Sequence, residues 1–113
     1  MDKKIVIHMV GSDCGKPEKE KEFNEWYNNR HVPMMLKSPY VKRAARYERI
    51  GDNKEFPEYL AIYEMESDEA LDMFLKSPYR QNELLQDSGA KAKAGDFVRR
   101  WLVDYKQIAT WEK

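Results

Sequence analysis

Residues 23–33 have the sequence FNEWYNNRHVP, which is typical of an amphipathic helix that ends in a histidine and a proline. Large apolar residues recur along it at helical spacing: Phe23, Trp26, Tyr27 and Met34. His31 follows Tyr27 by four positions and therefore falls on the same face. Pro33 disfavours regular helical geometry at this point. We therefore expect an imidazole in the last turn of a helix, facing inward among aromatic rings.

Four short runs of apolar or alternating residues predict strands, at residues 5–10, 40–50, 57–65 and 97–111. The first run is apolar on both faces, which is typical of a strand that is covered on both sides. Residues 11–15, which begin and end with glycine, predict a loop. In the last run, strict alternation would place Phe97, Trp101, Val103, Tyr105 and Trp111 on one face, with Arg99 as the exception.

Two further segments have helical spacing. The first begins near Pro17 and runs to His31, with a broken turn that extends to Leu36. The second begins after Ser67, a favourable N-cap residue, and is interrupted at Pro78. This second helix is expected to resume at residues 82–86 and to be followed by a loop at residues 88–95.

The resulting order is β-α-β-β-α-β, which predicts an α+β, ferredoxin-like fold in a single domain spanning residues 1–113. Its four-stranded antiparallel sheet would carry both helices on one face and leave the other face open. The residues expected on that open face are apolar: Leu60, Ile62, Leu102 and Ile108. Exposing them to water is unfavourable, so we expect a homodimer joined through its sheet faces with two-fold symmetry.

Composition excludes several functional classes. The 20 basic and 20 acidic residues cancel, so no overall field attracts nucleic acid. The single cysteine, Cys14, rules out an internal disulfide and suits a reducing compartment. The apolar run after residues 1–4 is too short for a signal peptide core or a membrane span. We therefore expect a cytoplasmic protein that binds neither nucleic acid nor membrane.

Residues 23–33, together with the sequence AARYE at residues 44–48, resemble the dimeric α/β-barrel superfamily, in particular its EthD-like branch. The resemblance implies two ferredoxin-like protomers whose sheets close into a barrel, and a pocket in each protomer between sheet and helices. Members include cofactor-free monooxygenases, polyketide cyclases and isomerase-like enzymes, so the fold does not fix the activity. A Pro-Gly turn common before the RY strand is Pro39-Tyr40 here, which leaves the substrate class open.

The resemblance implies that His31 is the catalytic residue, acting as a general base or as a hydrogen-bond donor to a phenolic or keto oxygen. The alternative is a structural histidine that caps the helix end. The remaining residues expected to bind substrate are Trp26, Tyr27, Arg46, Tyr47, Tyr63 and His8. Tyr47 and Tyr63 are included because adjacent strands could place them on one surface. His8 is either a core residue or a pocket group, and in some members of the superfamily a first-strand histidine acts together with a second one.

No cofactor or metal site is expected. The two histidines and Cys14 lack the spacing of metal ligands, and the chain has neither a glycine-rich phosphate loop nor a nucleophile elbow.

Three functional hypotheses follow. The first is a cofactor-free monooxygenase, cyclase or isomerase that removes a proton from an aromatic or polyketide-like small molecule, with Arg46 or a tyrosine holding the oxyanion. The second is a non-catalytic protein that binds a hydrophobic or aromatic molecule in the same pocket. The third is a structural dimer whose pocket is filled by its own side chains.

Overall fold

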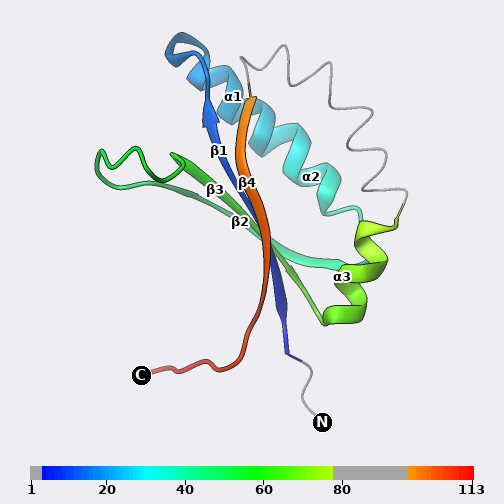
Figure 1. The fold of residues 1–113 in the computed structure, drawn as a ribbon. Coiled ribbons are helices and arrows are strands. Elements are labelled where there is room, and N and C mark those ends of the chain that lie inside the picture. Colours follow the sequence, from blue (N-terminus) through cyan, green and yellow to red (C-terminus); the bar gives the residue numbers. More distant parts are fainter. Residues whose placement is uncertain (1–3, 78–96) are drawn as a thin grey trace.

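The computed structural model describes residues 4–77 and 97–113 of the chain. Figure 1 shows their arrangement, with the helices on one side of a single sheet. The elements in chain order are β1 (Val6–Cys14), the short 3-10 turn η1 (Pro17–Lys19), α1 (Glu20–Trp26), the π-helical turn η2 (Tyr27–His31), α2 (Val32–Met35), β2 (Val41–Glu48), β3 (Tyr59–Met65), α3 (Asp68–Leu75) and β4 (Phe97–Lys106).

The sheet has the strand order β2-β3-β1-β4, and every neighbouring pair is antiparallel. The ferredoxin-like arrangement predicted from the sequence is therefore confirmed, including the hairpin formed by β2 and β3. The continuous helix from η1 to α2 and the separate helix α3 both cover the same face (Figure 1). Joining of two such sheets into a barrel stays a prediction at this point.

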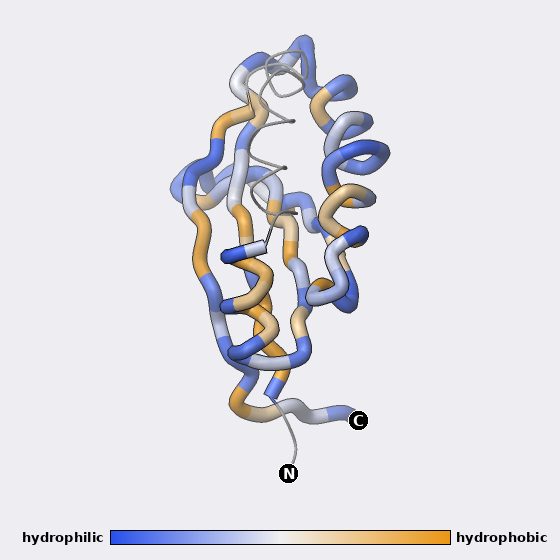
Figure 2. The backbone as a smooth tube through the Cα atoms, turned by 90° about the vertical axis from the view of Figure 1, so that its right-hand side faces the viewer, coloured by the Kyte–Doolittle hydropathy of each residue, from blue (hydrophilic) through white to orange (hydrophobic). Residues whose placement is uncertain are grey.

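The pleat of the two central strands separates a helix-facing side from an open side. On β1 and β3 the helix-facing residues are buried: Val6, His8, Val10, Tyr59, Ala61, Tyr63 and Met65. They pack against aromatic residues from the helices, chiefly Phe23 and Tyr27, to form the core. Figure 2 shows hydrophobic stretches along the strands and mainly hydrophilic residues on the helix that begins at η1.

The first helix continues past Pro33, where a break was expected. Val32 N–H bonds to the carbonyl of Tyr27, five residues earlier, so the chain forms one wide π-helical turn before α2. A proline in a regular helix clashes with the carbonyl four residues before it, and the wide turn relieves this clash. The helix therefore keeps its direction and ends at Met35.

Helix α3 begins as predicted. The side-chain oxygen of Ser67 accepts a hydrogen bond from the backbone N–H of Ala70 at 3.2 Å, which caps the first turn. Pro78 and the segments predicted as a resumed helix (82–86) and a loop (88–95) lie outside the described residues.

Three predictions about the strands are wrong. The last strand ends at Lys106, whereas residues 97–111 were expected to form it. Strand β1 continues through Gly11 to Cys14, where a loop was expected. Opposite Gly11, the pairing with β4 shifts by one residue, so Trp101 faces the open side while Phe97 faces the helices. A bulge reverses the alternation of side chains along a strand, and alternation alone cannot reveal it.

The open side of the sheet carries Ile7, Met9, Leu60, Ile62, Trp101 and Val103. Two residues assigned to it from the sequence lie elsewhere. Leu102 pairs with the helix-facing Val10 and packs against the core, and Ile108 lies beyond the end of β4. The open side nevertheless stays apolar. No helix within residues 4–77 and 97–113 is long and apolar enough to cross a membrane.

Gly11 is required by close packing on the open side. A methyl group placed there would lie 2.7 Å from the Pro57 ring and 2.8 Å from the Trp101 indole. Replacing Gly11 by Ala is therefore expected to lower the free energy of unfolding by about 1–3 kcal/mol, as overpacking does. Urea denaturation followed by circular dichroism measures this loss. Trp101→Leu removes part of the obstruction, so the loss should shrink in that background; an equal loss in both backgrounds would contradict this account.

Candidate functional site

An aromatic layer from the first helix forms the centre of the candidate site. Trp26, at the end of α1, lies edge-on against Tyr27 with ring centres 5.3 Å apart, and both side chains are buried. Phe23 and Phe97 complete this layer, with ring centres 6.0 Å apart. The sequence prediction that Trp26 and Tyr27 face inward is thus confirmed.

His31 also faces inward, at the end of the π-helical turn. Its ring stacks on Trp26 and lies edge-on to Tyr27, with ring centres 5.0 Å apart in each case, and its exposed fraction is 5%. The inward placement expected from the spacing of four residues after Tyr27 is kept in the π-helical turn. Turns of this kind are frequent at functional sites.

Arg46 reaches the same aromatic layer from the edge strand β2. Its guanidinium carbon lies 4.2 Å from the centre of the Tyr27 ring and 5.2 Å from that of Tyr59, which is a cation–π arrangement. Its Nη1 donates a hydrogen bond of 2.9 Å to the side-chain oxygen of Asn28. Burial lowers the pKa of Arg46, and the neighbouring tyrosines oppose this shift. The group nevertheless keeps its charge, because a free guanidinium titrates above pH 12.

Three buried N–H groups in this region have no hydrogen-bond partner among the described residues: Nε1 of Trp26, and Nε and Nη2 of Arg46. Buried donors of this kind are rare, and each calls for a water molecule or a bound oxygen atom as its acceptor. Two hollows, of about 270 and 200 Å³, lie on either side of Arg46 between β2 and the helix. The wall formed by Arg46 and Asn28 is common to both.

His8 forms the second half of the candidate site. It lies in the middle of β1 on the helix-facing side, and its exposed fraction is 1%. Its Nδ1 lies 2.6 Å from a carboxylate oxygen of Asp104, directly across on β4. The imidazole ring also contacts the rings of Tyr63 and Phe74. A carboxylate in this position fixes the orientation of the imidazole and stabilises its protonated form.

The structure therefore brings most of the predicted residues to the space between sheet and helices. His8, Tyr63 and Arg46 occupy neighbouring helix-facing positions of three adjacent strands. Tyr47 does not join them. It pairs with Leu60 on the open side of the sheet, where its exposed fraction is 51%. The expectation that Tyr47 and Tyr63 share one surface is wrong. In the pairing of β2 with β3, their side chains point to opposite faces of the sheet.

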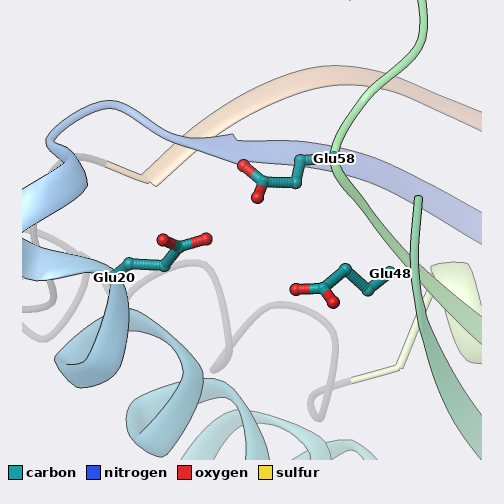
Figure 3. Close-up of side chains that lie close together, drawn as sticks. All are labelled: Glu20, Glu48 and Glu58. Atoms are coloured by element: carbon teal, nitrogen blue, oxygen red, sulfur yellow. The ribbon is translucent and has the colours of Figure 1, made fainter. Parts of the chain in front are cut away.

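Three glutamates meet at the end of the sheet near the β2–β3 hairpin. Carboxylate oxygens of Glu20, Glu48 and Glu58 lie within 4.8 Å of one another, and Figure 3 shows the three groups directed toward a common space. Glu20 also accepts a hydrogen bond from the Tyr59 hydroxyl. Burial raises the pKa of Tyr59, and its bond to Glu20 adds to this rise. Three carboxylates offer oxygen ligands for a hard cation, or they share a proton.

Burial also raises the pKa of Glu58, and a hydrogen bond with Glu20 and the charge of Glu20 add to this rise. Proton sharing accounts for the cluster without a metal ion. The expectation that the protein holds no metal stays a prediction.

Sequence reasoning missed Asp104 and the glutamate cluster. A signal for Asp104 exists, since it is the one charged residue within the run Trp101–Tyr105. The cluster gives no such signal. Glu20 lies in the charged run 18–22, which is indistinguishable from an ordinary solvated helix face, and its partners come from distant strands.

Comparison with known proteins identifies the family. A family model described as a domain of unknown function, DUF4286, matches residues 6–94, more than half of the chain. The chain belongs to the DUF4286 family. No curated protein matches the DUF4286 chain.

Solved structures with the same fold support the resemblance found in the sequence. An EthD family protein from Bacillus halodurans has a TM-score of 0.68 and 14% identity, covering 93% of the DUF4286 chain and 99% of its own. A hydroxynitrile lyase from Passiflora edulis has a TM-score of 0.61 and 15% identity, with coverage of 96% and 98%. A dimeric ferredoxin-like protein of unknown function from Thermobifida fusca has a TM-score of 0.56 and 9% identity, with coverage of 93% and 91%. At these identities the likeness shows the fold.

The raised pKa of Glu58 leads to a pH prediction. A carboxyl group whose pKa is higher in the folded state favours folding at low pH, and this contribution disappears as the pH rises through the folded-state pKa. Glu58→Gln is therefore expected to stabilise the protein near pH 7.5 and to leave it almost unchanged near pH 4. The gain is on the order of a few tenths of a kcal/mol, because solvent screens these groups.

Urea denaturation at the two pH values measures this effect. Glu66→Gln, at an exposed position outside the cluster, is the matched control and should change stability equally little at both pH values. A Glu58→Gln variant that loses the same stability at pH 4 and pH 7.5 would contradict the pKa shift.

Proposed function

We propose that this protein is a small cofactor-free enzyme that removes a proton from an aromatic or polyketide-like small molecule, with His8 as the general base. The observation that carries the proposal is the pair of His8 and Asp104, with 2.6 Å between Nδ1 and the carboxylate oxygen, on the buried helix-facing side of the sheet. Perturbed or paired titratable groups in such positions are candidates for catalysis.

Asp104 determines which nitrogen of His8 acts as the base. An ionised carboxylate only accepts hydrogen bonds, so the proton of the neutral imidazole lies on Nδ1 and the lone pair lies on Nε2. Nε2 then takes a proton from a carbon next to a carbonyl group or from a phenol. The imidazolium that results is stabilised by the Asp104 carboxylate. Asp104 is partly exposed, at 31% of its side chain, and so connects the buried ring to solvent.

Arg46 and Tyr63 are suited to stabilise the anion that remains on the substrate. From strand spacing and rise, the Cα atoms of His8 and Arg46 are about 12 Å apart, and Tyr63 lies on the strand between them. Within residues 4–77 and 97–113, Nε and Nη2 of Arg46 are buried donors that still require an acceptor. A developing oxyanion supplies that acceptor.

His31 is the base favoured by the sequence, and this proposal gives it a different role. Its stacking on Trp26 and edge contact with Tyr27 make it part of an aromatic wall against which a flat ligand packs. Replacing His31 is therefore expected to change ligand affinity more than the rate of proton transfer.

Proton abstraction is supported by the kinds of protein that have a similar fold. They include a hydroxynitrile lyase and an EthD family protein. Oxygen addition, aldol-type cyclisation and isomerisation of aromatic or polyketide-like molecules all begin with removal of a proton. The proposal therefore names the first step and the class of substrate.

We propose further that the enzyme is a homodimer joined through the open sides of its sheets. The apolar residues of this side, chiefly Met9, Ile62 and Val103, form a continuous surface of the kind that monomeric proteins rarely expose. The similar Thermobifida fusca protein is described as dimeric. A two-fold dimer would cover both surfaces at once.

Proton abstraction can be tested without knowing the natural substrate. The protein is incubated in D₂O with a panel of aryl ketones and phenols, and deuterium incorporation at acidic C–H positions is followed by NMR. His8→Gln is expected to lower the rate at least about 100-fold, and Asp104→Asn by about 10²–10⁴-fold, because each removes part of the base. His31→Gln should keep most of the rate.

Asp72→Asn, an exposed carboxylate change on α3, is the matched control and should leave the rate unchanged. Ligand-induced thermal stabilisation without any deuterium incorporation would overturn the enzymatic proposal in favour of a non-catalytic binding protein. A rate lost in His31→Gln but kept in His8→Gln would assign the base to His31.

The dimer has its own test. Ile62→Asp places a charge at the centre of the open side and is expected to raise the dimer dissociation constant at least about 100-fold, since a buried unpaired carboxylate is strongly unfavourable. Sedimentation velocity over a range of protein concentrations measures the change. Met73→Asp, an exposed position on the helix side, should leave the dimer intact. A wild-type protein that is monomeric at all concentrations would overturn the dimer.

A further inference from the structure

We propose that the C-terminal segment, residues 107–113, binds to a second copy of the chain and inserts Trp111 into an apolar pocket on the open side of that copy's sheet. The inference rests on the homodimer proposed above. Each copy would contribute its Trp111 to the other, and the apolar pocket of each copy would be filled only in the dimer.

The C-terminal segment carries two large apolar residues, Ile108 and Trp111, that make little contact with their own domain. It leaves the end of β4 and runs away from the helices (Figure 1). One backbone hydrogen bond, from Gln107 N–H to the carbonyl of Ile5, holds its first residue. Beyond it, Ile108 and Trp111 have exposed fractions of 84% and 86%. Two large apolar side chains this exposed on one short segment indicate a surface that binds elsewhere.

A pocket of about 290 Å³ lies on the open side of the sheet, near the β2–β3 hairpin. Met9, Leu60 and Trp101 line it from the sheet, and Phe56 and Pro57 line it from the hairpin. The volume is slightly below the range of about 300–1,000 Å³ that is usual for small-molecule sites. The pocket is therefore suited to one large side chain, and its aromatic residues offer edge and face contacts to an indole.

The direction of the segment favours a second copy over its own domain. Residues 107–111 extend about 17 Å, and the nearest strand residue of the chain's own pocket, Met9, pairs with Val103, three residues or about 10 Å back from Lys106. To reach it, the segment would have to reverse direction. The sequence of residues 107–110 is QIAT, which contains no Gly, Pro, Asn, Asp or Ser, the residues that dominate tight turns.

In a dimer joined face to face, each segment starts near one end of the partner's sheet. Met9 lies about 10 Å from the Val6 end of β1 and about 17 Å from the Cys14 end, and the rest of the pocket lies toward the Cys14 end, near the hairpin. A two-fold axis that runs across the strands brings the segment to the hairpin end of the partner's sheet, and the partner's pocket is then within reach.

Charges around the pocket complement those of the segment. Glu48 and Arg49 lie at the pocket, and Trp111 is followed by Glu112 and Lys113. With Trp111 inserted, the two residues after it bring one acidic and one basic side chain to a rim that carries one of each. Such an arrangement favours one orientation of the bound segment.

Sedimentation velocity tests the contribution of Trp111. Trp111→Ala is expected to raise the dimer dissociation constant about 30-fold, as truncation of a central aromatic contact typically does. Phe56→Ala removes one pocket wall and should have a similar effect, and the double variant should be little worse than either single one. Met73→Ala, an exposed apolar position on α3, is the matched control and should have no effect.

Disulfide trapping tests where the segment binds. In a Cys14→Ser background, Trp111→Cys combined with Phe56→Cys should form an intermolecular disulfide on mild oxidation, seen as a covalent dimer on a non-reducing gel. Trp111→Cys alone should form much less of it.

The outcomes separate this inference from the dimer itself. A wild-type monomer at all concentrations overturns both. A wild-type dimer that is unaffected by Trp111→Ala overturns the role of the segment and leaves the dimer standing. A disulfide within one chain shows that the segment fills its own pocket, and this also overturns the inference.

Discussion

The structure depends on one constraint, the apolar character of β1 on both of its faces. A strand with Val6, His8 and Val10 on one side and Ile7 and Met9 on the other is stable only when both sides are covered. The helices supply cover on one side, and they bring the aromatic layer against the imidazole. Within the described part of the chain no helix covers the other side, where Pro57 packs over Gly11. The catalytic and dimer proposals therefore concern the two faces of the same strand.

The wide turn before Pro33 links the backbone to the chemistry of the aromatic layer. It lets the helix pass a proline while Tyr27 and His31 stay on the inward face. Tyr27 forms the surface on which the guanidinium of Arg46 lies. Tyr27, His31 and Arg46 thus meet at a backbone irregularity, which is where functional residues are often found.

Local pattern was sufficient to predict the order of elements, the β2–β3 hairpin, the Ser67 cap and the inward face of the first helix. Each depends on residues that are close in the chain. The errors have a different origin. The bulge opposite Gly11 is a feature of the pairing between β1 and β4, and it reverses the face of Phe97 relative to strict alternation. Asp104 and Glu58 gain their partners from elements far away in the sequence, so their roles emerge only when the register is known.

The charged side chains of the two outer strands affect how the sheet can associate with other chains. Strand β2 exposes Lys42 and Arg43, of which Arg43 pairs with Glu64, and β4 exposes Arg99, so basic side chains stand on both outer strands of the sheet. Unpaired strand edges invite pairing with other chains, and charged side chains, lysine above all, discourage it. Edge pairing, which has no natural end, is thereby discouraged, and the faces of the sheet are left as the surfaces for association.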